Sequence, residues 1–217
     1  EFEPQINWLT NRFAWYGTRQ IFECLSLTFR ANADGFFVAH HYRHSSSMST
    51  FVVECDEATW RRSGLERMSD ENSRAYCETV FAPDLAGHPL ITNKSVWRQF
   101  PLLSCRRWSM NHLILIGDAL RTVHFSIGSG TRLAFEDAIA LDRAFAEAGK
   151  DVPRALAIFE RERRPVVEKI LGAANASSYW YERLAEKMQL RPTELAYDYM
   201  TRSGRMTDER LRELSPK

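Results

Sequence analysis

The chain has 217 residues with 29 basic and 28 acidic side chains, so its formal net charge at pH 7 is +1. This balance gives no long-range field that would draw the chain to nucleic acid or to an anionic membrane, and we expect neither partner. The hydrophobic share of 44% is sufficient for a packed core. The longest apolar runs are far shorter than the roughly 20 residues that a membrane-spanning helix needs.

The cysteines are widely spaced, and none belongs to a Cys-x-x-Cys pair of the kind that binds zinc, so no metal site is expected. Wide spacing is typical of free thiols in a reducing compartment. We therefore expect a cytoplasmic protein whose thiols are buried or half-buried. The four are Cys24, Cys55, Cys77 and Cys105.

The first half of the sequence predicts an antiparallel sheet followed by two helices. Residues 11–16, 21–30, 36–43 and 49–55 are rich in aromatic and β-branched side chains, and turn-forming residues at 32–35 separate the second run from the third. Asp56 is placed to cap a helix over 57–68, and Ser69 to cap another over 70–81. Residues 96–103 favour extended structure again.

The second half predicts a buried strand and a set of helices. Residues 113–116 are all apolar, which indicates a strand buried on both faces. A loop with two glycines follows, then a helix whose apolar residues recur at helical spacing as far as 148, with Gly149 as its C-cap. Pro153 begins the next helix, which should kink or split at Pro165 and continue to about 188. The polar tail over 203–217 is either a helix end or a linker.

The stretch from 113 to 141 has the order of a ligand site. A buried strand ends at Gly117, a carboxylate follows at Asp118, and a loop containing Gly128 and Gly130 leads into a helix. Ligands bind at such strand ends, and a helix start offers unpaired N–H donors with a partial positive charge. Asp118 could accept hydrogen bonds from a sugar hydroxyl, while the helix start would stabilise an electron-rich carbonyl or an anionic ring.

This stretch resembles the second FAD fingerprint of the para-hydroxybenzoate hydroxylase class of flavoprotein monooxygenases. The loop His-Phe-Ser-Ile-Gly-Ser-Gly-Thr at 124–131, followed by Glu-Asp-Ala at 136–138, is closest to a subgroup of this class. That subgroup includes salicylyl-CoA and aminobenzoyl-CoA hydroxylases and tryptophan-derivative hydroxylases. Segments 49–58 and 159–165 are similar as well. The Trp-x-Trp-x-Ile-Pro signature of flavin halogenases does not occur.

The resemblance implies an α+β fold, in which an antiparallel substrate-domain sheet is joined to the last strand and helix of a Rossmann-like FAD domain and to C-terminal helices. The expected boundaries are 1–112 for the substrate-binding sheet domain, 113–150 for the C-terminal part of the FAD-binding domain, and 151–217 for the C-terminal helices.

The resemblance also implies a set of site residues. His124 would lie on the substrate side of the flavin ring, where it could orient a phenol or merely fix the loop. Strand alternation puts His40 and Tyr42 on one face and His41 on the other, so that the first two could line a substrate pocket or pack at a surface. The residues expected to bind FAD are Gly117, Asp118, Gly128, Ser129, Gly130 and Thr131.

The implied reaction is hydroxylation of an aromatic ring, free or carried on CoA, with O2 and with NADH or NADPH as co-substrate. Many relatives have Ala-His where Leu120 and Arg121 stand; Arg121 either binds a phosphate or is solvated. The Gly-x-Gly-x-x-Gly and Asp-Gly fingerprints of the class are absent.

The absent fingerprints, and a first residue that is Glu1, predict a fragment whose partner is an N-terminal FAD-binding half. Alone, the chain would self-associate or be marginally stable, and would bind FAD weakly or not at all. The alternative is a non-catalytic module that binds a partner and retains the fold without the cofactor.

Overall fold

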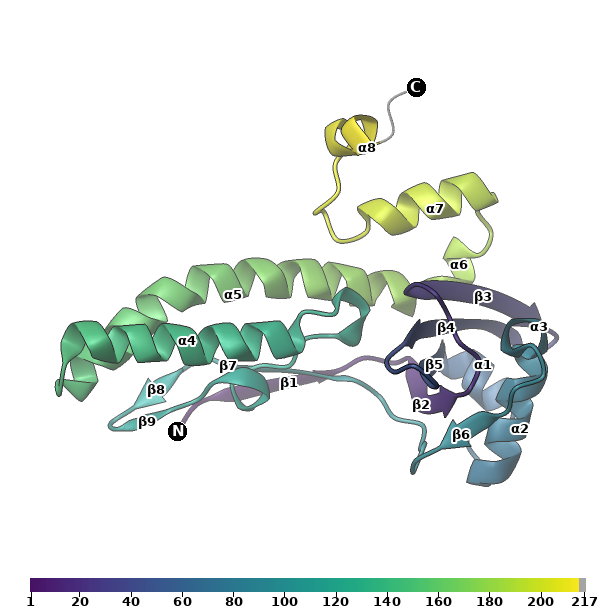
Figure 1. The fold of residues 1–217 in the computed structure, drawn as a ribbon, viewed down its shortest axis with the longest axis horizontal. Coiled ribbons are helices and arrows are strands. Elements are labelled where there is room, and N and C mark those ends of the chain that lie inside the picture. The colour runs from purple at the N-terminus through teal and green to yellow at the C-terminus, as the bar shows by residue number, and fades with distance from the viewer. Residues whose placement is uncertain (215–217) are drawn as a thin grey trace. The chain divides into compact units, whose positions relative to one another are not determined.

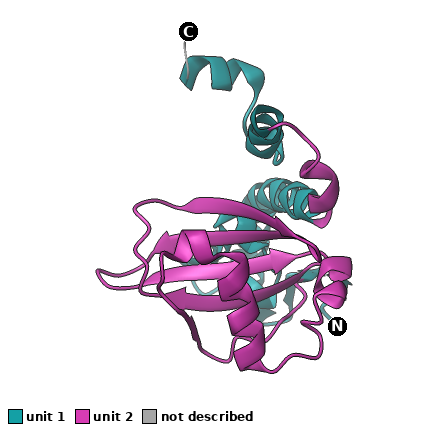
Figure 2. Ribbon diagram, turned by 90° about the vertical axis from the view of Figure 1, so that its right-hand side faces the viewer, with its two compact units in different colours: residues 1–9, 101–181, 192–217 teal, residues 10–100, 182–191 magenta. Residues whose placement is uncertain are grey.

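The computed structural model describes residues 1–214, which form two compact units (Figure 2). Unit 1 comprises Glu1–Leu9, Pro101–Tyr181 and the chain from Pro192 onward; unit 2 comprises Thr10–Phe100 and Glu182–Arg191. Residues 1–9 and 101–112, which we expected in the substrate-binding sheet domain, belong to unit 1. The chain is a mixed α+β protein, as expected.

Unit 2 is built on a five-stranded antiparallel sheet with the order β3-β4-β5-β2-β6. Strands β3 to β5 form the expected meander, and β2 pairs with β5 and β6. The tight turn before β4 is confirmed, because the side-chain oxygen of Asn32 accepts hydrogen bonds from the N–H groups of Asp34 and Gly35. The strands are β2 Arg12–Thr18, β3 Ser26–Asn32, β4 Gly35–Arg43, β5 Ser49–Cys55 and β6 Leu90–Thr92.

Both expected helix caps of unit 2 are present. The Asp56 carboxylate accepts from the N–H of Thr59, and the Ser69 hydroxyl accepts from that of Asn72. The first helix ends at Arg62 rather than at 68, because Gly64 adopts a positive φ of 74° that turns the chain out of the helix. The helices are α1 Glu57–Arg62, α2 Asp70–Val80, α3 Ala82–Leu85 and α6 Leu184–Lys187.

One face of the sheet packs against α1, α2 and α3 and forms the core of unit 2. Tyr16, Phe37 and Phe51 from the strands meet Cys77 and Phe81 from the helical side. Burial raises the pKa of the Cys77 thiol to about 12 and raises that of the Cys55 thiol as well, because an apolar surrounding disfavours the thiolate.

All four cysteines are unpaired thiols, as expected. Cys55, Cys77 and Cys105 are buried, whereas Cys24 is exposed, which corrects the expectation of four buried or half-buried thiols. No helix of the described chain is both long enough and apolar enough to cross a bilayer.

Unit 1 combines two small sheets with long helices (Figure 1). Strand β1 pairs with β7, and β8 pairs with β9, both antiparallel. Helices α4 and α5 pack together through Leu133, Ala144, Phe159 and Val167. The elements are β1 Pro4–Trp8, β7 Pro101–Cys105, β8 Ser109–Met110, β9 Leu113–Ile114, the 3-10 turns η1 Gly117–Ala119 and η2 Phe125–Ile127, α4 Gly130–Ala148, α5 Val152–Glu182, α7 Pro192–Thr201 and α8 Asp208–Leu214.

The prediction of a strand buried on both faces at 113–116 is wrong. The strand covers only Leu113–Ile114. Leu113 is 60% exposed, and residues 114–116 are half-buried. Burial of both faces needs neighbouring strands and covering layers. Within residues 1–214, β9 pairs with β8 alone.

The helix after the glycine loop is confirmed as α4, and Gly149 ends it. Helix α5 is not split at Pro165. Pro165 lies on the exposed side of α5, where water can bond the carbonyl that lacks a helical N–H partner. The tail includes α8; residues 215–217 of that predicted segment lie outside the described residues.

Candidate cofactor-binding site

The turn at Gly117 and Asp118 requires glycine at its first position. Gly117 has a φ of 58°, and a Cβ there would lie 3.3 Å from the Cβ of Ala134 in α4. Its carbonyl accepts hydrogen bonds from the backbone N–H groups of Leu120 (3.0 Å) and Arg121 (3.1 Å), which closes the 3-10 turn η1. The turn is therefore held closely against the second helical turn of α4.

A buried ionic cluster holds both peptide groups of Gly117. The fully buried Asp137 carboxylate accepts from the N–H of Gly117 at 3.1 Å and pairs with the Nη2 of Arg121 at 2.7 Å. Arg121 also donates from Nη1 to the carbonyl of Gly117 at 2.9 Å. The other Asp137 oxygen accepts from Arg163 Nε (3.1 Å) and Nη2 (3.0 Å), and Arg163 lies 3.3 Å from Glu136.

This cluster shows that both expectations for Arg121, a phosphate contact and a solvated side chain, are wrong. The side chain is only 2% exposed and its guanidinium is bound within the protein, so it is neither solvated nor on a phosphate. Arg121 and Asp137 instead fix the direction of the Gly117 peptide groups, while Arg163 from α5 adds a second positive charge that Glu136 balances. A turn held in this way is preorganised and does not have to be ordered by a ligand.

Asp118 follows this turn with an exposed side chain. It has no ion-pair partner among the residues that the structure describes. Its carboxylate can therefore accept hydrogen bonds from a ligand hydroxyl.

The loop after the turn leaves its backbone open at Gly128. Gly128 has a φ of 60°, and a Cβ at this position would meet no atom within 4 Å. Its N–H donates to the carbonyl of Phe125 at 3.0 Å, which closes the second 3-10 turn. A Cβ at Gly130 would lie 3.8 Å from that of Val123, so the loop folds back on its own beginning.

The start of α4 is a helix terminus without a side-chain cap. Ser129 occupies the capping position, but its hydroxyl donates to the carbonyl of Ile127 at 3.2 Å. The backbone N–H groups of Gly130 and Thr131 are thus left for a ligand oxygen, and the helix dipole favours negative charge there. Electron-rich oxygens and sugar hydroxyls are groups that FAD carries, so these residues fit it. That Asp118, Gly128 and Gly130 share one open cleft stays a prediction.

His124 is 2% exposed and is bound inside the loop. Its Nδ1 accepts from the N–H of Ser126 at 3.3 Å, and its ring stacks on Phe125 at 4.3 Å between centroids. The Tyr181 ring of α5 lies 6.3 Å away. These contacts match the loop-fixing alternative, and a catalytic role for His124 stays a prediction.

In unit 2 the predicted alternation of the histidines on β4 is confirmed. His41 faces the helical side, where its ring stacks on Phe51 at 5.3 Å. Desolvation by burial lowers the pKa of His41 to about 4. His40 is 7% exposed on the other face, with its Nε2 3.1 Å from an oxygen of Glu54 on β5. Tyr42 is half-buried.

Glu54 was not anticipated from the sequence, although alternation on β5 could have placed it. It is 2% exposed, and its second oxygen accepts from the side-chain amide of Asn11 at 2.8 Å. A buried carboxylate needs such partners. Within residues 1–214, no group of three or more His, Cys, Asp or Glu side chains could hold a metal ion.

A protein-family model described as an FAD binding domain matches residues 13–174. The chain is 39% identical over 213 residues to a salicyloyl-CoA 5-hydroxylase from a Streptomyces species, which covers 94% of this chain and 41% of that protein. It is 41% identical over 201 residues to the protodeoxyviolaceinate monooxygenase of Chromobacterium violaceum, covering 92% of this chain and 53% of that protein. The chain thus spans about half the length of these curated relatives.

Solved structures that share its fold include the following two. PqsL from Pseudomonas aeruginosa superposes with a TM-score of 0.60 at 23% identity, over 82% of this chain and 50% of that one. HpxO from Klebsiella pneumoniae, complexed with FAD, gives a TM-score of 0.56 at 17% identity, over 97% of this chain and 54% of that one. At these identities the likeness is one of fold alone.

Proposed function

Because this chain belongs to the FAD-binding domain family, we propose that it forms one wall of the FAD site in a monooxygenase that hydroxylates aromatic rings. The proposal rests on one observation: the start of α4 has no side-chain cap, and α4 packs against the Gly117 turn, which Asp137 holds by a hydrogen bond. In this proposal the N–H donors of that helix start and the exposed carboxylate of Asp118 bind the same ligand. The names of the relatives supply the reaction class.

Each candidate residue has a role in this proposal. Asp118 accepts a hydrogen bond from the ribityl chain or holds the pyrophosphate region through its neighbouring backbone. Bound FAD, reduced by NADH or NADPH, supplies the activation of O2. The residues that contact the flavin ring are Gly128, Ser129, Gly130 and Thr131. Gly128 leaves space for the ring, and the unbound backbone N–H groups of Gly130 and Thr131 stabilise negative charge on it. Gly117 provides the turn that brings Asp118 into place.

The substrate side is assigned to the sheet of unit 2. His40 and Tyr42 lie on the sheet face opposite His41, and Glu54 orients the imidazole of His40. An oriented imidazole can exchange a hydrogen bond with a phenol or aniline, and His124 is the candidate from the loop. The substrate is an aromatic acid or amine, free or carried on CoA, since the Streptomyces relative is named for a CoA thioester.

The remainder of the FAD site is assigned to a dinucleotide-binding half that contains the Gly-x-Gly-x-x-Gly fingerprint. In this proposal β9 and α4 are the last strand and helix of a Rossmann-like domain. Large apolar side chains are exposed on them, with Leu113 at 60%, Phe135 at 68% and Ile139 at 53%. The complementary half covers them; without it, the chain self-associates through this surface.

Complementation tests the proposal. The part of protodeoxyviolaceinate monooxygenase that lies outside the matched region would be co-expressed with this chain. We expect the pair to purify yellow and to couple NAD(P)H oxidation to hydroxylation of an aromatic acid or amine. A stable pair that copurifies without flavin would contradict the proposal and favour the non-catalytic module.

A further inference from the structure

The backbone of the glycine loop is tied to the C-terminal part of the chain by one arginine. Arg202, just after α7, donates from Nη2 to the carbonyl of Ser126 at 3.2 Å. Its Nε donates to the hydroxyl of Ser177 at 2.9 Å, and the two serine hydroxyls lie 2.9 Å apart. Ser177 is fully buried on α5. Arg202 therefore reaches Ser126 both directly and through Ser177.

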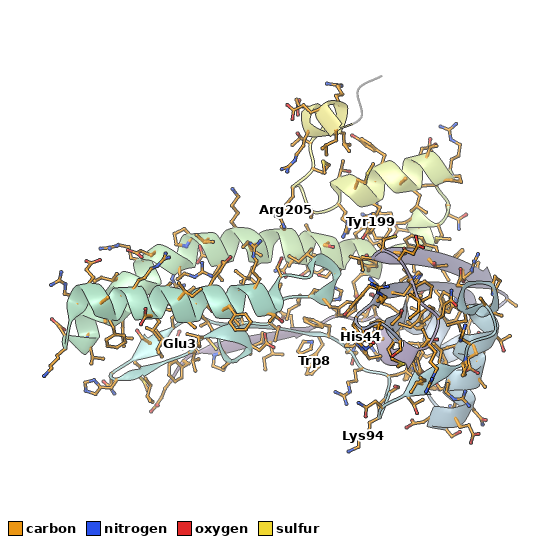
Figure 3. The ribbon with its side chains drawn as sticks, in the orientation of Figure 1. Glu3, Trp8, His44, Lys94, Tyr199 and Arg205 are labelled. Atoms are coloured by element: carbon orange, nitrogen blue, oxygen red, sulfur yellow. The ribbon has the colours of Figure 1, made fainter. Side chains whose placement is uncertain are left out.

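Arg202 is itself held in place by α7. Its Nη1 donates at 2.8 Å to the carbonyl of Tyr199, which is labelled in Figure 3, and its guanidinium carbon lies 3.7 Å from the centre of the Tyr199 ring. The same carbon lies 5.9 Å from the ring centre of Tyr181. The planar fork of arginine can serve three acceptors and stack on an aromatic face at once, which a lysine ammonium cannot do.

Helix α7 is in turn docked on the end of α5. The indole N–H of Trp180 donates to Asp198 at 2.5 Å, and the rings of Trp180 and Tyr199 meet edge to face at 5.4 Å between centroids. The hydroxyl of Tyr181 donates to that of Tyr199 at 3.4 Å. These contacts give α7 a defined position from which Arg202 approaches the loop.

We propose that α7 fixes the loop of residues 124–131 through Arg202, and that Arg202 is a positioning residue for the flavin ring. The bound carbonyl of Ser126 lies two residues before Gly128 and four before the uncapped N–H of Gly130. Holding that carbonyl fixes the peptide orientations that set the direction of the N–H donors of Gly130 and Thr131. The assignment to flavin rests on the proposed function above, whereas the coupling between α7 and the loop does not.

Hydrogen exchange measured by mass spectrometry tests the coupling in the chain without flavin. We expect Arg202→Leu to speed amide exchange in residues 124–131 by about tenfold or more, because charge-assisted hydrogen bonds that close the loop are lost. Arg205→Leu is the matched control. It removes the same charge three residues later from an exposed side chain, and it should leave the loop unchanged.

The flavin readout uses the complemented pair. Arg202→Leu should weaken FAD binding by about tenfold and change the band shape of the bound flavin's visible absorbance, which a loss of general stability would not do. Arg202→Lys should restore little of the FAD affinity or of the absorbance band shape, because an ammonium cannot make the three hydrogen bonds of the guanidinium in the same geometry. If amide exchange in residues 124–131 stays at the wild-type rate in Arg202→Leu, the proposal is overturned, even if the amides of α7 exchange faster.

A variant that exchanges faster everywhere, including β4 and β5, has lost global stability. In that case Ser177→Ala and Arg202→Lys decide: faster loop exchange in a stable background supports the coupling, and unchanged exchange overturns it. If the wild-type pair binds no FAD, the proposed function fails, and loop exchange still decides whether α7 fixes the loop.

Discussion

Replacing Asp137 with asparagine is the sharpest test of the ionic cluster that holds the Gly117 turn. The carboxylate binds two guanidinium groups and one backbone N–H, and its side chain is fully buried. An asparagine of the same shape keeps one acceptor oxygen but loses the charge. It also turns an N–H2 group toward Arg121 or Arg163, and both arginines would remain buried.

Removing one partner of a buried ion pair costs about 3–5 kcal/mol, because the other charge stays uncompensated. Glu136 remains 3.3 Å from Arg163 and offsets part of this loss, so we expect Asp137→Asn to lower the unfolding free energy by about 3 kcal/mol. For a chain of this size the melting temperature should fall by about 6–12 °C. The Gly117 turn should also loosen, so FAD binding by the complemented pair should weaken.

The assay is urea unfolding followed by circular dichroism, with Asp142→Asn as the control. Asp142 is an exposed carboxylate on the same helix, and its replacement should change stability by less than about 0.5 kcal/mol. If Asp137→Asn is as stable as this control, the cluster does not hold the turn and the reasoning fails.

Three further outcomes are expected. Gly117→Ala should cost about 1–2 kcal/mol in chemical unfolding because of its left-handed φ, plus a clash at the 3.3 Å approach to Ala134, and a neutral result would contradict the strained turn. The pKa of His41 is lowered to about 4, so the unfolded chain takes up a proton as pH falls from about 6.5 to 4 while the folded chain does not. The unfolding free energy should therefore fall by about 2–3 kcal/mol across that pH window, and His41→Phe should not show this fall. If the unfolding free energy of His41→Phe falls with pH as much as that of wild type, His41 is not the cause. A thiol reagent should modify Cys24 alone in the native chain, and fast labelling of further cysteines would show that the cores are open.

Much of the fold could be predicted wherever the signal is local. Alternation located β2 to β5, the caps at Asp56 and Ser69 located two helices, and helical spacing with Gly149 located α4. Strand β1 gave no such signal because all five of its residues are exposed. The run at 113–116 has the composition of a buried strand, but composition does not supply the neighbouring strands that burial requires.

The sequence indicated the backbone positions of the candidate site but not the side chains that hold that backbone in place. Glycines and a carboxylate after an apolar run form a local sequence pattern, so positions 117, 118, 128 and 130 could be proposed from the sequence, and their contact with FAD stays a prediction. Asp137 lies among helix charges that normally face solvent, and its partners are 16 residues before it and 26 after it. Arg202 is 76 residues from the carbonyl that it binds. Periodicity gives no information about contacts at such separations.

FAD titration of the complemented pair, followed by quenching of flavin fluorescence, tests directly whether this chain forms a wall of the flavin site. The comparison is between wild type and Asp118→Ala, with Asp151→Ala as an exposed control outside the loop. We predict saturable binding by wild type and control, and binding weakened by about tenfold or more in Asp118→Ala, where a hydrogen bond to a charged acceptor is lost. Equal FAD affinity in all three proteins would contradict the claim that this turn and helix start form a wall of the flavin site.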